Sequence, residues 1–143
     1  MSDLSKREAI DLARGGRLGL KPGIHASAFP VLRIDPPDGV YYLLVFGEPE
    51  AAVGVAAVDV ATGDVTTWAT LPGTAPHTLI DAETASRRAG LCGKSRAQLV
   101  WRSSPNSRSP LYPLWQISTD EETVYVDQQG TVWPSLESPA RGG

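Results

Sequence analysis

The sequence predicts an α+β fold built from two tandem units, each a short helix followed by a meander of about four antiparallel strands, with the helices packed on the sheet. Three observations support this prediction. An amphipathic segment with helix-capping residues occurs twice, at 4–16 and 80–90. A hairpin-like stretch also occurs twice, as VDVATGDV (58–65) and VYVDQQGTV (124–132). The expected strands follow one another without crossover helices, which favours α+β over α/β.

The two predicted helices have recognisable ends. In the first, LSKREAIDLARGG (4–16), Ser5 and Glu8 have the spacing of a capping box, and Gly15 can terminate the helix. In the second, IDAETASRRAG (80–90), Asp81 takes the N-cap position and Gly90 the stop. Each helix is expected to be about two to three turns long, so it needs packing against a sheet to persist.

Four strands are expected in the first unit, at 29–35, 40–47, 54–60 and 64–71. The last two flank ATG (61–63), where a left-handed Gly63 would close the turn without steric cost. Segment 40–47 is apolar on both alternating faces, which indicates a central strand covered on both sides.

Four strands are likewise expected in the second unit, at 97–103, 111–119, 122–127 and 131–136. The proposed boundaries are 1–72 for the first unit, 73–137 for the second and 138–143 for a disordered tail, within one compact domain overall. The sequence leaves open whether the two half-sheets join or stack. In either arrangement, the helices are expected to cover one face.

Bulk properties predict a soluble cytoplasmic protein without cofactors. The chain has 143 residues and a net charge of −3, and its one cysteine, Cys92, cannot form an internal disulfide. The first residues are charged where a signal peptide would be apolar, and the longest apolar runs, such as 40–46, are far shorter than a membrane span. We therefore expect no membrane association.

Charge is segregated along the chain in the order basic, acidic, basic, acidic. No basic residue lies between Arg33 and Arg87, and no acidic residue lies between Arg87 and Arg108. This two-fold alternation agrees with a duplicated unit. It could also steer an oppositely charged partner or drive head-to-tail association into a homodimer.

The helix, the meander and the motif VDVATGDV (58–65) together resemble the PepSY family of small domains. A second, shortened copy of the motif stands at 126–132 as VDQQGTV, so the resemblance covers most of the chain as two degenerate tandem copies. It implies a cystatin-like and PepSY-like fold and a non-catalytic binding or inhibitory role, often extracytoplasmic and linked to peptidases. Some small bacterial immunity proteins share a similar helix-plus-hairpin shape.

Candidate catalytic groups are few. Cys92 lies near Arg88 and Lys94, which could lower its pKa, but no histidine has a spacing that identifies it as a base. Asp59 and Asp127 could form a repeat-related carboxylate pair, although an Asp at a hairpin entrance usually accepts hydrogen bonds from its own turn. The cysteine and histidines show no clustering typical of a metal site.

The basic segment 87–108 offers a second class of site. With Trp101 among its charges it could contact phosphates, yet the sequence pI of about 5.3 is far from that of a typical nucleic-acid-binding domain, so we do not expect such binding. The tryptophans lie on predicted strands, where core packing is their commonest role. As candidate binding residues we name Tyr112, Trp115, Trp101, Arg87, Arg88, Arg96, Arg102 and Arg108.

The resulting hypothesis is a non-enzymatic module that binds a protein or peptide, as an adaptor, inhibitor or immunity-type protein. Pairing at a sheet edge or a groove between the two halves would supply the contact. The alternatives are a small enzyme using Cys92 or the Asp59 and Asp127 carboxylates, and weak nucleic-acid binding through segment 87–108.

Overall fold

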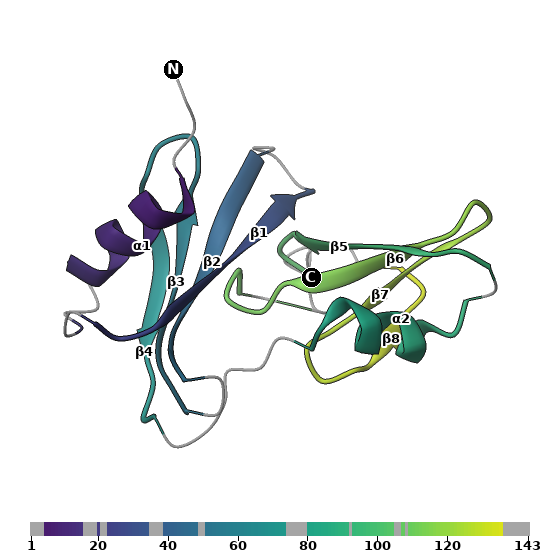
Figure 1. The fold of residues 1–143 in the computed structure, drawn as a ribbon. Coiled ribbons are helices and arrows are strands. Elements are labelled where there is room, and N and C mark those ends of the chain that lie inside the picture. The colour runs from purple at the N-terminus through teal and green to yellow at the C-terminus, as the bar shows by residue number, and fades with distance from the viewer. Residues whose placement is uncertain are drawn as a thin grey trace, which may run out of the picture.

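The structure of the protein is a computed structural model that describes residues 5–15, 20, 23–34, 39–48, 51–73, 80–91, 93–104, 107 and 109–135. Its elements are α1 (Lys6–Gly15), β1 (Ala26–Arg33), β2 (Gly39–Glu48), β3 (Ala51–Asp59), β4 (Val65–Thr70), α2 (Ala82–Ala89), β5 (Arg96–Trp101), β6 (Leu114–Ser118), β7 (Thr123–Val126) and β8 (Val132–Trp133) (Figure 1). Each predicted helix and strand overlaps one of these elements, so their predicted order is confirmed. The boundaries proposed for the two units remain a prediction, and the tail at 138–143 lies outside the described residues.

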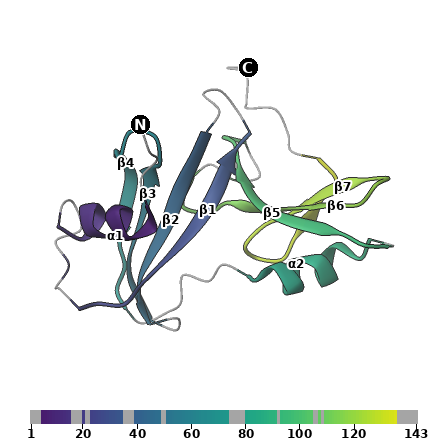
Figure 2. The same ribbon diagram turned by 45° about the horizontal axis from the view of Figure 1, so that its top comes forward.

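The eight strands form a single sheet in the order β4-β3-β2-β1-β5-β6-β7-β8. All neighbours are antiparallel except β1 and β5, which are parallel. The sheet turns sharply at this junction: in both views β2, β3 and β4 run roughly upright, whereas β5, β6 and β7 run across the picture (Figures 1 and 2).

The predicted fold class, two tandem α+β units with helices packed on an antiparallel sheet, is therefore wrong. One mixed sheet makes up most of the described structure, and the two helices have only 10 and 8 residues. The question of joining or stacking is also answered, because the half-sheets join edge to edge through β1 and β5. Caps and alternation are local signals, and they do not encode which strand edges pair across a long stretch of chain.

Three apolar clusters hold the sheet together. A central cluster consists of Val31, Tyr41, Leu43, Val55, Ala57, Leu99, Trp101 and Leu111. An α1 cluster consists of Ala9, Ala13, Leu44, Phe46, Ala56 and Val58, and an α2 cluster of Ala85, Ile117, Val124 and Val126. Leu43 and Leu44 are both fully buried, which confirms that β2 is a central strand covered on both faces.

The two helices lie on opposite faces of the sheet. Leu99 pairs with Trp115 on β6, and Trp115 packs against both the central and the α2 cluster, so these clusters share one face. Leu43 belongs to that face, whereas Leu44 and Phe46, which pack against α1, belong to the other. The expectation that both helices cover one face is wrong, because the joined halves present opposite faces to their helices.

A β-bulge between β2 and β3 depends on Gly47. The register shifts between Phe46 and Gly47, and Gly47 has φ +112°, a conformation that side chains disfavour. A Cβ atom there would lie 2.6 Å from the carbonyl oxygen of Ala51. The bulge therefore tolerates only glycine.

Gly47→Ala should lower the free energy of unfolding by more than about 2 kcal/mol, because it adds a backbone clash to the cost of positive φ. Gly23→Ala is the matched control, since Gly23 has φ +92° but open space around its Cβ position, and it should cost about 1 kcal/mol. Urea unfolding of both variants measures the difference. Equal losses would show that the contact with Ala51 is relieved at no cost.

The predicted caps are present at both helices. The N–H of Glu8 donates to Ser5 Oγ (3.1 Å) and the N–H of Ser5 donates to Glu8 Oε1 (3.2 Å), which is the expected capping box. Asp81 caps α2 by accepting from the N–H of Thr84 at 2.7 Å, and Gly90 ends α2 at φ 63°. Hydrogen bonds from Thr84 lower the pKa of Asp81 from 3.8.

Because the pKa of Asp81 is lower in the folded state, its stabilisation is complete above the unfolded value and is lost as the pH falls through the folded value. Asp81→Asn keeps an N-cap acceptor but cannot titrate there. The stability advantage of the wild type over this variant should therefore be constant above about pH 5 and shrink as the pH falls below about 4, as measured by urea unfolding. A difference independent of pH would contradict this assignment.

Candidate binding groove between β1 and β5

The junction between the two halves of the sheet is very short. β1 pairs with β2 along its whole length, from Ala26 to Arg33, but with β5 only through Leu32 with Val100 and Arg33 with Trp101. Both pairs lie at the carboxyl ends of β1 and β5. Toward their amino ends the two parallel strands diverge, which opens a wedge in the sheet (Figures 1 and 2).

Pro30 explains why the pairing stops. Successive residues of a strand direct their backbone groups to opposite edges. The N–H of Ile34 donates to the carbonyl oxygen of Trp101 (3.0 Å), whereas the carbonyl oxygen of His25 accepts from Gly47 on the β2 side (2.8 Å). Even-numbered residues of β1 therefore face β5. Pro30 is one of them, and it has no N–H with which to continue the ladder.

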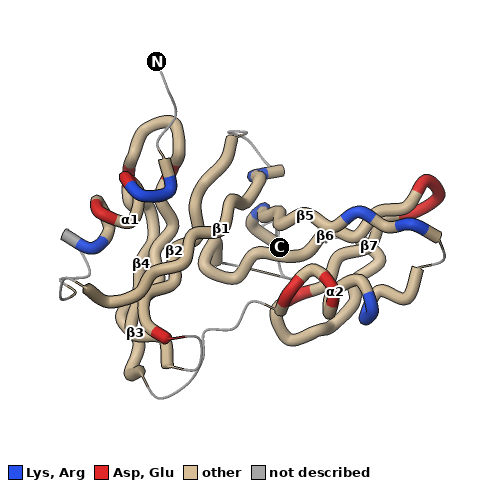
Figure 3. The backbone as a smooth tube through the Cα atoms, viewed as in Figure 1, with Lys and Arg blue, Asp and Glu red and all other residues tan. Residues whose placement is uncertain are grey.

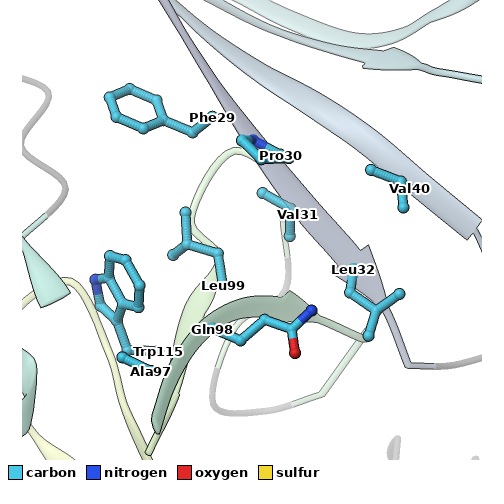
Figure 4. Close-up of a pocket in the computed structure, with 9 residues that line it drawn as sticks. All are labelled: Phe29, Pro30, Val31, Leu32, Val40, Ala97, Gln98, Leu99 and Trp115. Atoms are coloured by element: carbon cyan, nitrogen blue, oxygen red, sulfur yellow. The ribbon is translucent and has the colours of Figure 1, made fainter.

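The wedge contains an open groove of about 360 Å³. Its lining residues are Phe29, Pro30, Val31, Leu32, Val40, Ala97, Gln98, Leu99 and Trp115 (Figure 4). Eight of the nine are apolar, and Gln98 is the one polar side chain among them. The close-up shows the Phe29, Leu99 and Trp115 side chains on one side of β1, with Leu32 and Val40 on the other.

Strand edges form both walls of the groove. By the same alternation, Ala26, Ala28 and the carbonyl of Pro30 face the gap from β1, and Ala97 and the N–H of Leu99 face it from β5. These positions lie outside the β1–β5 register of the described residues. The groove therefore combines apolar side chains with strand backbone that has hydrogen-bonding capacity.

Trp115 is held in place from the α2 side. Its Nε1 donates to the carbonyl oxygen of Ile80 at 2.6 Å, just before the helix begins. The N–H of Ile80 donates in turn to Gln128 Oε1 at 2.9 Å, and Gln128 Nε2 donates to the carbonyl oxygen of Pro113 at 2.7 Å. Gln128 thus ties the start of α2 to the start of β6, and the groove wall with it.

The three aromatic candidates have different environments. Trp115 lines the groove and is partly buried. Trp101 is 6% exposed in the central cluster, where its Nε1 donates to Ser107 Oγ at 3.2 Å and the Arg33 guanidinium lies 5.4 Å from its ring centroid. Tyr112 is 50% exposed in the β5–β6 connection, away from the groove lining. The structure brings only Trp115 into this site.

The basic candidates do not converge on one face. Arg87 and Arg88 are exposed on α2, and Arg88 lies against Gly130 in the β7–β8 turn. Arg96 is exposed on the face of β5 that points away from α2, and Arg102 is half-buried just after that strand. Arg108 lies outside the described residues. Figure 3 shows that the basic residues of this region are spread along α2 and β5 rather than gathered at one place.

The two repeat-related aspartates serve their turns. Asp59 Oδ1 accepts from the N–H groups of Ala61 (2.8 Å) and Thr62 (2.9 Å). Asp127 Oδ1 accepts from Gln129 and Thr131 (both 2.9 Å), and its Oδ2 accepts from the indole of Trp133 (3.0 Å). Five inter-strand steps of about 4.8 Å separate their strands, so they cannot act as a pair.

Cys92 lies outside the described residues. Within the described ranges, no three metal-ligating side chains of the His, Cys, Asp or Glu types come together.

The groove itself was not predicted. The signal that could have revealed it is Pro30, which stands inside a predicted strand although proline is confined to edges, strand starts and bulges.

No protein-family model matches this chain, and no curated protein is similar to it in sequence. Its structure is similar to that of a candidate lipoprotein from Clostridium difficile 630, at 14% sequence identity, covering 96% of this chain and 94% of that one, with a TM-score of 0.34. A TM-score this low is too weak to indicate a shared fold. Of the helices described, none has the length and apolar character to cross a bilayer.

Gln128→Leu should lower the free energy of unfolding by about 1–3 kcal/mol, because it leaves the partly buried Ile80 N–H and Pro113 carbonyl without their partner. Gln129→Leu is the matched control at an exposed neighbour and should change stability by less than about 0.5 kcal/mol. Urea unfolding compares the two. Equal effects would show that the Gln128 bridge contributes nothing.

Proposed function

We propose that this chain is a non-enzymatic protein- or peptide-binding module, acting as an adaptor, inhibitor or immunity-type protein, and that it binds in the groove between β1 and β5. The observation that supports the proposal is the groove itself, an open apolar hollow with strand edges on both walls. A binding role is also what the PepSY-like pattern of the sequence implies, and that resemblance is part of the proposal.

The lining of the groove favours a polypeptide over a small metabolite. Small-molecule sites usually combine apolar walls with several convergent polar groups that fix the orientation of the ligand. Here the lining offers one polar side chain, Gln98, and no acid, base or nucleophile among the nine described residues. Main-chain groups along two strand edges would instead recognise another main chain.

Burial on binding would supply the driving force. Covering apolar surface contributes roughly 25 cal/mol per Å², and aromatic residues such as Phe29 and Trp115 are frequent anchors at protein interfaces. Val40, which is 38% exposed at the rim, would also be covered by an occupant.

The experiment is a selection of displayed peptides against the immobilised protein, followed by affinity measurement on Val40→Arg and Val132→Arg. These two valines are similarly exposed, at 38% and 37%, but only Val40 lines the groove. Selected peptides should bind Val40→Arg at least about tenfold more weakly, a loss of about 1.4 kcal/mol, and Val132→Arg with an affinity close to that of the wild type.

Two outcomes would count against the proposal. If no peptide is enriched, a peptide-binding function is contradicted. If selected peptides bind both variants as tightly as the wild type, the groove is not where they bind.

A further inference from the structure

We propose that the groove takes an extended peptide segment that adds as a β-strand to the open edge of β5, with alternating apolar and acidic side chains. This inference rests on the binding function proposed above and adds to it the mode of binding and the chemistry of the bound segment.

The open edge of β5 provides the pairing groups. The carbonyl oxygen of Trp101 faces β1, so odd-numbered residues of β5 direct their backbone groups toward the gap. On the amino-terminal side of the junction, Ala97 is the odd-numbered residue of β5 that lies in the open part of the wedge. On its other edge β5 is fully occupied by β6, from Arg96–Ser118 to Val100–Leu114. A strand entering the wedge would therefore find the N–H and carbonyl groups of Ala97 available for pairing.

β5 is a better partner than β1 for an added strand. The β1 edge is interrupted by Pro30, which offers a carbonyl but no N–H. Segment 96–101 contains no proline. Pro30 also keeps the wedge from closing, because direct β1–β5 pairing cannot continue past it. An inserted strand needs twice the inter-strand spacing of about 4.8 Å, so it can enter only beyond the junction pairs, where β1 and β5 diverge.

The two faces of the groove set the side-chain pattern of the bound segment. Phe29, Leu99 and Trp115 lie on the face of the central cluster, so residues of the added strand on that face should be apolar. On the other face, the exposed Gln98 and Arg96 lie on β5, and Leu32 and Val40 border the groove from β1 and β2. Successive residues of a strand alternate between faces, which predicts apolar and polar residues in turn.

Charge favours acidic residues at the polar positions. Strands β1 and β5 contain no carboxylate, and Arg96 lies exposed at the amino end of β5; Asp120 and Glu121 lie beside the preceding Lys94. A glutamate on the same face of an adjacent strand would lie within reach of its guanidinium, and opposite charges on neighbouring strands attract. The segment that fits is thus one that alternates valine-like and acidic residues.

A second open edge in the described structure provides a control. β4 pairs only with β3, and the N–H of Leu71 donates to Val53, so even-numbered residues such as Thr70 face outward. β4 has no charged residue or proline to prevent strand addition. It lacks, however, the two-sided groove that lies beside Ala97.

The test uses a fluorescein-labelled decapeptide of alternating valine and glutamate, measured by fluorescence polarisation against Ala97→Pro and Thr70→Pro. Each substitution removes one outward-facing N–H and leaves the existing ladder of its strand intact. Ala97→Pro should weaken binding at least tenfold, whereas Thr70→Pro should leave it within twofold. The reverse result would place strand addition at β4 and overturn the proposal. Thermal unfolding verifies that both variants are folded.

Two further measurements avoid proline substitutions: one uses the wild-type protein with modified probes, and the other uses Arg96→Glu. The probe is N-methylated on its valines in one isomer and on its glutamates in the other. The isomer whose methyl groups face β5 should bind at least tenfold more weakly, and the other should retain binding. Arg96→Glu should weaken binding of the valine–glutamate probe and strengthen that of a valine–lysine probe.

The outcomes separate this inference from the proposed function. If display-selected peptides bind in a Val40-dependent way but both N-methylated isomers bind like the parent, the function stands and strand addition is wrong. Equal loss for both isomers, or no binding of the unmodified probe up to about 1 mM, also overturns strand addition. Only failure of the peptide selection as well would remove the binding function.

Discussion

The parallel contact between β1 and β5 is the constraint on which the rest of the structure depends. Two residue pairs, Leu32 with Val100 and Arg33 with Trp101, turn two four-stranded sheets into one. So few hydrogen bonds contribute little net stability, since each contributes about 1 kcal/mol. What holds the joint is burial: the central cluster takes residues from both halves, and Tyr41 Oη donates to the Pro110 carbonyl oxygen at 2.7 Å across it.

The groove can form because only two residue pairs join β1 to β5. A junction held by side chains rather than by a long ladder can stay open at one end without losing the fold. Pro30 is an exception to the rule that proline is excluded from the interior of paired strands. In a protein whose local sequence otherwise agrees with its fold, such exceptions tend to mark functional or strained sites. Trp115 then lies at the meeting point of the central cluster, the α2 cluster and the groove, so its position is set by packing on two sides.

Local features could be predicted from the sequence because their causes are local. Ser5 and Glu8 make the expected capping box, and Asp59 and Asp127 accept hydrogen bonds within their own turns. The fold class could not be predicted, because the pairing of β1 with β5 depends on residues that are far apart along the chain. Trp101 was assigned to a binding surface, but alternation along β5 directs it into the central cluster. The groove has no continuous motif and exists only after β1 and β5 meet.

The opposite placement of the two helices has a simple geometric meaning. A two-fold rotation about a line between β1 and β5, parallel to the strands, keeps them parallel, mirrors the strand order and exchanges the faces of the sheet. All three relations hold here, with α1 on one face and α2 on the other. The sequence separation between Asp59 and Asp127 equals that between the paired Leu32 and Val100, so one constant offset relates equivalent residues of the two halves. The single chain therefore has the internal symmetry of an isologous dimer of half-length chains. Its groove lies beside the pseudo-axis, where Pro30 makes β1 differ from β5, which contains no proline.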